Sequence, residues 1–169
     1  MKEKLRHPVV LLGLLIITFG LSYSFIAVSR KYGFVFIDSL WAGNEVLNAV
    51  LQMTPEQKHI HKLATMTLDV AFPIAYSALF TGMTLRYFAG SSYMEFLLLP
   101  AILVLPIDLI EGAVQLLILN GQWNPMLAWK YVLTLGKFIL FFLAMGIALV
   151  GLVRAILERV LMFRKMKRT

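Results

Sequence analysis

The chain has 169 residues, of which 60% are hydrophobic and 15% are charged, and its formal net charge is +7. Soluble domains average about 45–50% apolar and about 25% charged residues, so this composition excludes a soluble domain and predicts an integral membrane protein. The chain has no cysteine, which excludes thiolate catalysis, disulfide exchange and iron–sulfur ligation. We assign the basic excess to lipid headgroups and topology, so membrane lipids are expected as partners and nucleic acid is not.

Four segments are apolar enough to cross a bilayer, where a helix needs about 20 mostly apolar residues. They are residues 8–29, 63–88, 96–119 and 129–153. The first follows basic residues but is longer than the apolar core of a signal peptide, so we interpret it as a retained signal anchor. The predicted fold is all-α: an antiparallel four-helix transmembrane bundle that forms a single domain over residues 1–169.

The connections between these spans differ in kind. Residues 89–92 form a tight turn, and residues 120–125 form a turn-rich loop. Residues 34–62 are predicted to form an external amphipathic helical segment, because four apolar residues share one helical face: Ile37, Leu40, Leu47 and Leu51. Within this segment Thr54, Pro55 and Gln57 have the pattern of a capping box that opens a helix leading into the second span.

Lysine and arginine are distributed unequally between the two ends of the predicted bundle. Ten lie at the end that holds both termini: Lys2, Lys4, Arg6, Arg86, Arg154, Arg159, Arg164, Lys165, Lys167 and Arg168. Five lie at the other end: Arg30, Lys31, Lys58, Lys62 and Lys130. The positive-inside rule therefore predicts that both termini are cytoplasmic and that residues 154–169 form a cytoplasmic basic tail.

Ionisable residues inside the spans are the most informative feature of the sequence. They are Asp69, Asp108, Glu111 and Lys137. A charge in hydrocarbon costs at least ~2.5–3.5 kcal/mol on insertion scales, so each group needs a partner, a proton or a water-filled cavity. At 1.5 Å per residue the acids lie roughly 9–18 Å from the outer surface, and Lys137 falls in the same range. We therefore expect Lys137 within ion-pair distance of at least one of these acids.

Further polar residues on the same helical stripes complete a predicted ligand-binding pocket in the outer half of the bilayer. Its members are Asp69, Tyr76, Asp108, Glu111, Gln115, Thr134 and Lys137. One lysine cannot neutralise three carboxylates, which favours a binding site, although a buried ion pair that only fixes helix register stays open. No cofactor or metal is expected, because no cysteine and no cluster of carboxylates near His59 and His61 completes a tetrahedral set.

Two stretches within the spans, together with Lys137, form a family-like pattern: Asp69-Val70-Ala71-Phe72-Pro73-Ile74-Ala75-Tyr76 and Asp108-Leu109-Ile110-Glu111. In these residues the sequence resembles a family of small, uncharacterised bacterial four-span membrane proteins. The family pattern is an Asp-x-x-Phe-Pro-x-x-Tyr helix and an Asp-x-x-Glu-Asn helix, and this chain departs from it at Gly112. The resemblance covers residues 47–154 and implies the four-helix fold and a multi-pass location in the bacterial inner (plasma) membrane. It implies no activity.

Three functions stay open at this point. The leading hypothesis is a site for a small amphipathic or cationic molecule, or a lipid headgroup, open to the outer leaflet. An alternative is an intramembrane enzyme that acts on a lipid or isoprenoid by carboxylate acid/base chemistry. The third is a non-catalytic assembly or partner-binding subunit. The sequence does not decide whether the chain is an enzyme, or whether it forms a homo-oligomer.

Overall fold

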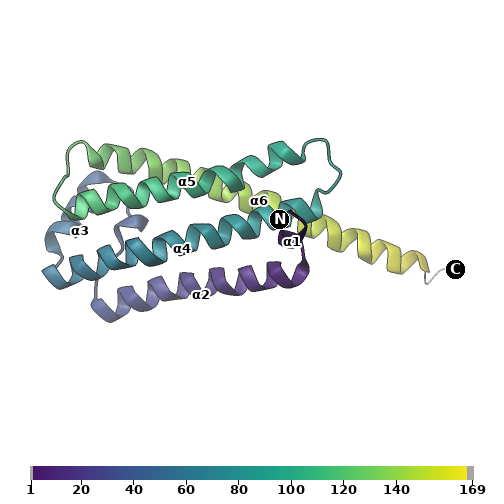
Figure 1. The fold of residues 1–169 in the computed structure, drawn as a ribbon, viewed down its shortest axis with the longest axis horizontal. Coiled ribbons are helices and arrows are strands. Elements are labelled where there is room, and N and C mark those ends of the chain that lie inside the picture. Colours follow the sequence, from purple (N-terminus) through teal and green to yellow (C-terminus); the bar gives the residue numbers. More distant parts are fainter. Residues whose placement is uncertain (1, 167–169) are drawn as a thin grey trace.

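The computed structural model describes the backbone of residues 2–166 and the side chains of residues 3–162. Its helices are α1 (Lys2–Leu5), α2 (Pro8–Tyr32), the 3-10 helix η1 (Ile37–Ser39), α3 (Gly43–Gln52), α4 (Pro55–Tyr87), α5 (Met94–Leu119) and α6 (Met126–Met166). The long helices α2, α4, α5 and α6 run side by side as an antiparallel bundle (Figure 1). Each is long and apolar enough to cross a membrane, so the predicted fold is confirmed and the chain is a multi-pass membrane protein.

Two of the long helices extend beyond the predicted spans. Helix α4 begins at Pro55, whereas the second span was predicted from residue 63. Helix α6 continues to Met166, so the first part of the predicted basic tail prolongs the fourth span as helix. No proline or glycine follows Gly151 to end that helix. The predictions for Lys167, Arg168 and the two chain ends lie outside the described residues.

The start of α4 is fixed by the capping box that the sequence predicted. The backbone N–H of Thr54 donates to Gln57 Oε1 at 2.9 Å, and the N–H of Gln57 donates to Thr54 Oγ1 at 3.2 Å. Gln57 Nε2 also donates to the carbonyl oxygen of Tyr32 at 2.9 Å. The cap therefore joins the beginning of α4 to the end of α2.

The bundle is built around α4, which contacts α2, α5 and α6, while α5 and α6 also pack on each other. Helix α2 packs mainly on α4, and Leu11 is its one buried residue. Two apolar clusters fill the interior, one around Tyr76 and Val104 and the other around Ile37 and Ile118. Asp108 and Glu111 of α5 lie between these two clusters along the helix.

Close helix contacts occur at two glycines. A Cβ atom added to Gly82 would lie 2.6 Å from the carbonyl oxygen of Leu5, so the link between α1 and α2 lies directly on α4. A Cβ atom added to Gly151 would lie 2.7 Å from Tyr87 Cβ, so α6 touches the C-terminal end of α4. These contacts place α1, the end of α4 and the second half of α6 together at one end of the molecule (Figure 1).

The segment between α2 and α4 covers the opposite end of the bundle. Helix α3 is amphipathic as predicted, but it buries Val46 and Val50, whereas Leu51 of the predicted apolar face is 55% exposed. The predicted face is wrong because the helix is not continuous: residues 40–42 separate η1 from α3 and change the helical register. The interruption turns η1 toward the bundle interior.

Candidate functional site

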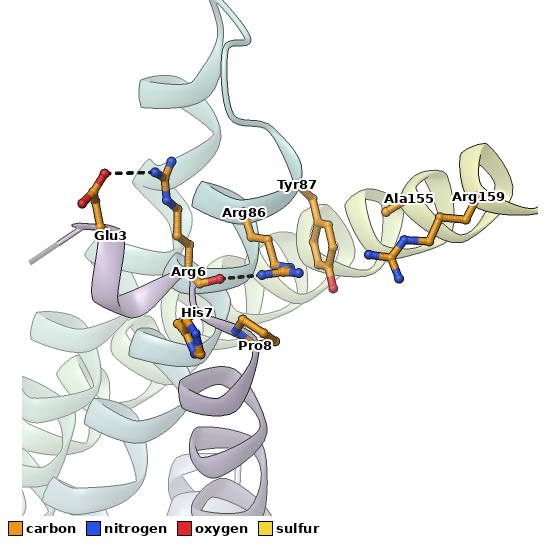
Figure 2. Close-up of a pocket in the computed structure, with 8 residues that line it drawn as sticks. All are labelled: Glu3, Arg6, His7, Pro8, Arg86, Tyr87, Ala155 and Arg159. Atoms are coloured by element: carbon orange, nitrogen blue, oxygen red, sulfur yellow. Dashed lines mark hydrogen bonds and ion pairs between the residues drawn. The ribbon is translucent and has the colours of Figure 1, made fainter. Parts of the chain in front are cut away.

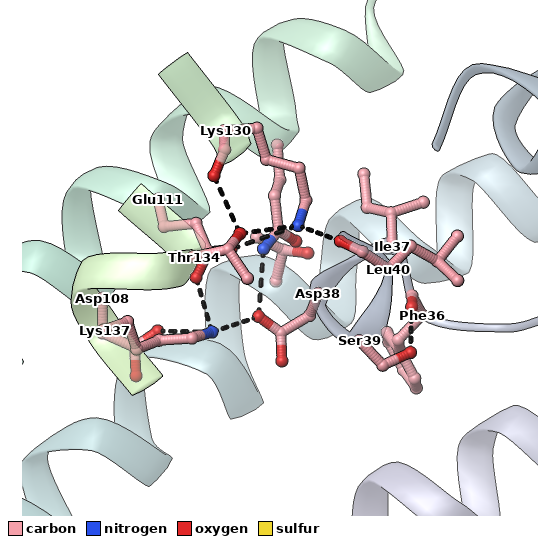
Figure 3. Close-up of polar contacts among 12 residues, drawn as sticks. Phe36, Ile37, Asp38, Ser39, Leu40, Asp108, Glu111, Lys130, Thr134 and Lys137 are labelled. Carbon is pink, nitrogen blue, oxygen red and sulfur yellow. Dashed lines mark hydrogen bonds and ion pairs between the residues drawn. The ribbon is translucent and has the colours of Figure 1, made fainter. Parts of the chain in front are cut away.

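Three elements converge on one buried polar network, drawn in Figure 3. Helix α5 contributes Asp108 and Glu111, which are three residues apart and share a helical face. Helix α6 contributes Lys130, Thr134 and Lys137, whose spacing of four and then three residues also keeps them on one face. The short helix η1 adds Asp38 from the covering segment.

Lys137 lies at the centre of the network. Its Nζ atom is 2.5 Å from Asp38 Oδ1, 2.5 Å from Glu111 Oε2 and 3.2 Å from Asp108 Oδ1. Lys137 donates a hydrogen bond to Asp38 Oδ1, and its contacts with Glu111 and Asp108 are ion pairs. The predicted pairing of Lys137 with an intramembrane acid is therefore present, and the lysine contacts three acids.

A second lysine pairs with the same glutamate. Lys130 Nζ lies 3.2 Å from Glu111 Oε1 and also donates to the carbonyl oxygen of Leu40 at 2.9 Å. The hydroxyl of Thr134 donates to Glu111 Oε1 as well. Lys130 was counted among the basic residues at the outer end of the bundle and was not predicted as a pocket residue, but the structure buries it in the network, with 1% exposure. Glu111 is fully buried with a lysine at each carboxylate oxygen.

Asp38, like Lys130, is a site residue that the predicted pocket did not include. Its carboxylate accepts from Lys137 and, at 3.2 Å, from Gln115 Nε2, and its side chain keeps 30% exposure. Burial raises the pKa of Asp38, but the charges of Lys137 and Lys130 and these hydrogen bonds outweigh it, so the pKa lies below the ordinary 3.8. In one continuous helix over residues 34–62 Asp38 would lie away from the predicted apolar face, whereas the break between η1 and α3 turns it toward Lys137.

Tyr76 joins the network to the apolar core. Its hydroxyl donates to Asp108 Oδ2 at 2.5 Å, so Asp108 has a phenol on one oxygen and Lys137 on the other. The ring of Tyr76 packs edge-on against Phe72 and Phe141, with centroids 5.1 and 5.0 Å away. The tyrosine therefore links α4 to the charged faces of α5 and α6.

Asp69 lies apart from these contacts. It is buried beside a cleft of about 260 Å³ between α4 and α5, and forms no ion pair or side-chain hydrogen bond with the described residues. A Cβ atom on Gly112 would be 3.8 Å from Asp69 Oδ2, an ordinary contact. Thus six of the seven predicted pocket residues belong to one network, and Asp69 does not. Whether a ligand reaches the network stays a prediction.

The network has the spacing of a cation site, and Lys137 fills it. Ligand oxygens of Asp38, Asp108 and Glu111 lie within 4.8 Å of one another. The Lys137 ammonium contacts all three, so a metal ion at that point would require the lysine to move away. His61 has another role: its Nε2 accepts from the backbone N–H of Ile37 at 3.1 Å and so helps to hold η1 in place.

An apolar groove between α2, α4 and α6 passes Tyr76 and extends along α4 from Phe72 to Tyr87. Its volume is about 560 Å³. Phe72 and Tyr76 line it on α4, Phe141 and Leu149 on α6, and Leu15 on α2. Helix α2 packs on α4 and does not close over the neighbouring face of α6, and the groove lies in the space between them. Tyr76 is the predicted pocket residue that faces both the groove and the charged network.

Comparisons of the chain with protein-family models, with curated proteins and with solved structures find no match.

Proposed function

We propose that this membrane protein binds a hydrocarbon chain of a membrane lipid in the groove between α2, α4 and α6. The observation that carries the proposal is a groove of about 560 Å³, lined almost entirely by apolar side chains, within the apolar part of the bundle. Along α4 it extends from Phe72 to Tyr87, roughly 22 Å at 1.5 Å per residue. That length exceeds half of the ~30 Å hydrocarbon core, so the groove can hold the chain of a lipid from one leaflet.

In this proposal the charged network supports the groove. It joins η1, α5 and α6 through Lys130 and Lys137, while α2 stays outside and packs mainly on α4. Tyr76 is the contact between the two, because its ring lines the groove and its hydroxyl holds Asp108. A chain in the groove therefore lies against a residue that is part of the network.

A second ligand is favoured by the same tyrosine. A molecule with an alkyl chain and a cationic head could place its charge near Asp108, since Tyr76 lines the groove and its hydroxyl donates to that carboxylate. This is the acidic pocket predicted from the sequence. The dodecyltrimethylammonium ion is a suitable probe, and binding that is tighter than that of a zwitterionic lipid and lost in Asp108→Asn would support it.

We also propose that the protein lies in a bacterial inner membrane with both termini in the cytoplasm. The support is the unequal distribution of basic residues. The burial of Lys130 strengthens it, because this lysine pairs with Glu111 and does not count as a free charge at the outer end.

The test of chain binding uses native mass spectrometry of the full protein in detergent, titrated with dioleoylphosphatidylcholine. Leu149→Trp fills the groove, and Val150→Trp adds the same side chain at the neighbouring position, which does not line it. We expect Leu149→Trp to weaken lipid binding severalfold and Val150→Trp to leave it unchanged. Equal binding by both variants would show that the groove is not the lipid site.

A further inference from the structure

A basic pocket lies at the end of the bundle opposite the charged network (Figure 2). Its volume is about 490 Å³, and its polar lining includes Glu3, Arg6, Arg86, Tyr87 and Arg159. In Figure 2 the side chains of Arg86, Tyr87 and Arg159 extend toward the same opening. Three arginines and one glutamate give this lining a formal charge of +2, without counting His7.

Close packing holds the walls of this pocket together. Gly151 lets α6 approach Tyr87, and Ala155 and Arg159 follow Gly151 on the same helical face at intervals of four residues. Gly82 allows the carbonyl of Leu5 to lie on α4, which brings α1 over the same place. The guanidinium of Arg86 then donates to the carbonyl oxygen of Arg6 at 2.9 Å.

The arginines retain unused hydrogen-bonding capacity. Arg6 pairs with Glu3 at 3.2 Å, but neither Arg86 nor Arg159 has a carboxylate partner among the residues that the structure describes. A guanidinium carries five N–H donors in a planar fork that matches phosphate, and Arg86 uses one of them on Arg6. Two arginines are therefore available to an anion.

The basic pocket is continuous with the apolar groove. A cleft of about 200 Å³ shares Leu11, Tyr87 and Leu152 with the groove, and it shares Arg86, Tyr87 and Arg159 with the basic pocket. Tyr87 lines all three cavities. A single molecule can thus extend from the arginines into the groove without leaving the surface of the bundle.

We propose that this pocket binds the phosphate of an anionic glycerophospholipid whose hydrocarbon chain lies in the groove. The inference rests on the proposed function, because the groove supplies the site of the chain. Arg86 and Arg159 contact the phosphate oxygens, and the net positive lining selects an anionic headgroup over a zwitterionic one. Basic pockets between membrane helices are known to bind anionic lipid headgroups at the membrane surface.

The experiment compares dioleoylphosphatidylglycerol with dioleoylphosphatidylcholine, which carries identical chains, on the full protein by native mass spectrometry. We expect the wild type to prefer the anionic lipid by at least about tenfold, as charged hydrogen bonds typically give. The double variant Arg86→Gln/Arg159→Gln should lose this preference and keep its binding of phosphatidylcholine. The control is Arg154→Gln, because Arg154 lies on the same helix, pairs with Glu158 at 2.8 Å and does not line the pocket.

The outcomes separate the two proposals. Equal affinity of the wild type for both lipids, or a preference that survives in the double variant, overturns the headgroup site and leaves the groove intact if Leu149→Trp still weakens binding. If Leu149→Trp has no effect, the groove proposal itself fails. Arg159→Gln alone, at an exposed position, gives the same test with a partial loss if the double variant does not fold. Displacement of phosphatidylglycerol by equimolar inorganic phosphate would show that the pocket takes free anions, and would overturn the lipid assignment.

Discussion

Glu111 shows how a carboxylate is accommodated inside an apolar bundle. It is fully buried, and each of its oxygens faces a different lysine, Lys130 at 3.2 Å and Lys137 at 2.5 Å. Together with Asp38 and Asp108 the network contains three carboxylates and two ammonium groups, a formal charge of −1. Removal of one cation would leave a buried carboxylate without compensation, which is far more costly than breaking an exposed pair.

We therefore expect Lys130→Met and Lys137→Met each to lower the free energy of unfolding by about 3–5 kcal/mol. Lys58→Met is the control, because Lys58 lies at the same end of the bundle but in none of the described ion pairs, and it should stay within about 0.5 kcal/mol of wild type. Unfolding of the purified variants in detergent with increasing denaturant measures the differences. A Lys130→Met variant as stable as Lys58→Met would contradict the network.

Asp38 predicts a dependence of stability on pH. Its pKa in the folded protein is below the ordinary 3.8, so its ionised form stabilises the fold fully above pH 3.8. This contribution is lost as the pH falls through the lower, folded-state pKa. The difference in stability between wild type and Asp38→Asn should thus be largest at neutral pH and shrink below pH 3.8, as melting curves from pH 7 to pH 2.5 would measure. A difference that does not change with pH would contradict the assigned ion pair.

At the scale of elements, η1 and α6 show what the sequence could and could not predict. Helical spacing places Lys130, Thr134 and Lys137 on one face of α6. Lys130 was counted only as a basic residue at the outer end of the bundle, so its hydrogen bond to Glu111 was not predicted. Asp38 could not be placed, because its position depends on the break between η1 and α3 and on the contact of His61 with Ile37. Local periodicity predicts a helical face, whereas a packing contact between distant segments requires the three-dimensional fold.

The contact between α4 and α6 depends on a glycine. In Gly151→Ala the new Cβ atom would lie 2.7 Å from Tyr87 Cβ and 2.8 Å from Phe88 Cε2, so the helices must separate, typically at a cost of ~1–3 kcal/mol. Gly146→Ala on the same helix meets nothing within 4 Å and should gain up to about 1 kcal/mol from helix propensity. Denaturant unfolding of the two variants should thus give changes of opposite sign. Equal effects would mean that the close approach at Gly151 is absent.

At the scale of the whole molecule, the fold was predictable because four long apolar segments leave few alternatives. Short connections make α4 and α5, and α5 and α6, antiparallel neighbours, and the capping box at Thr54 predicted the start of α4. The basic pocket was not predictable because it depends on how α1 packs on α4, and the groove was not because it depends on how far α2 stands from α6. Spacing along one helix contains no information about that distance.

The orientation of the bundle is testable because the chain has no cysteine. Ser92 lies in the turn between α4 and α5, and Gln122 lies in the loop between α5 and α6, so the two exposed positions are at opposite ends. In intact bacterial cells an impermeant maleimide should label Gln122→Cys and should label Ser92→Cys only after permeabilisation. The reverse pattern would place the termini outside.

The ion pair between Lys137 and Asp38 has a consequence for biosynthesis. The two residues are 99 positions apart, and Glu111 is made 19 residues before Lys130. Because the chain is synthesised from its N-terminus, every acid of the network leaves the ribosome before either lysine does. If helix α5 entered the membrane before α6 was made, its carboxylates would have no cationic partner there. The cations, Lys130 and Lys137, both belong to α6. The carboxylates of α5 therefore gain their ion pairs only when α6 packs beside it.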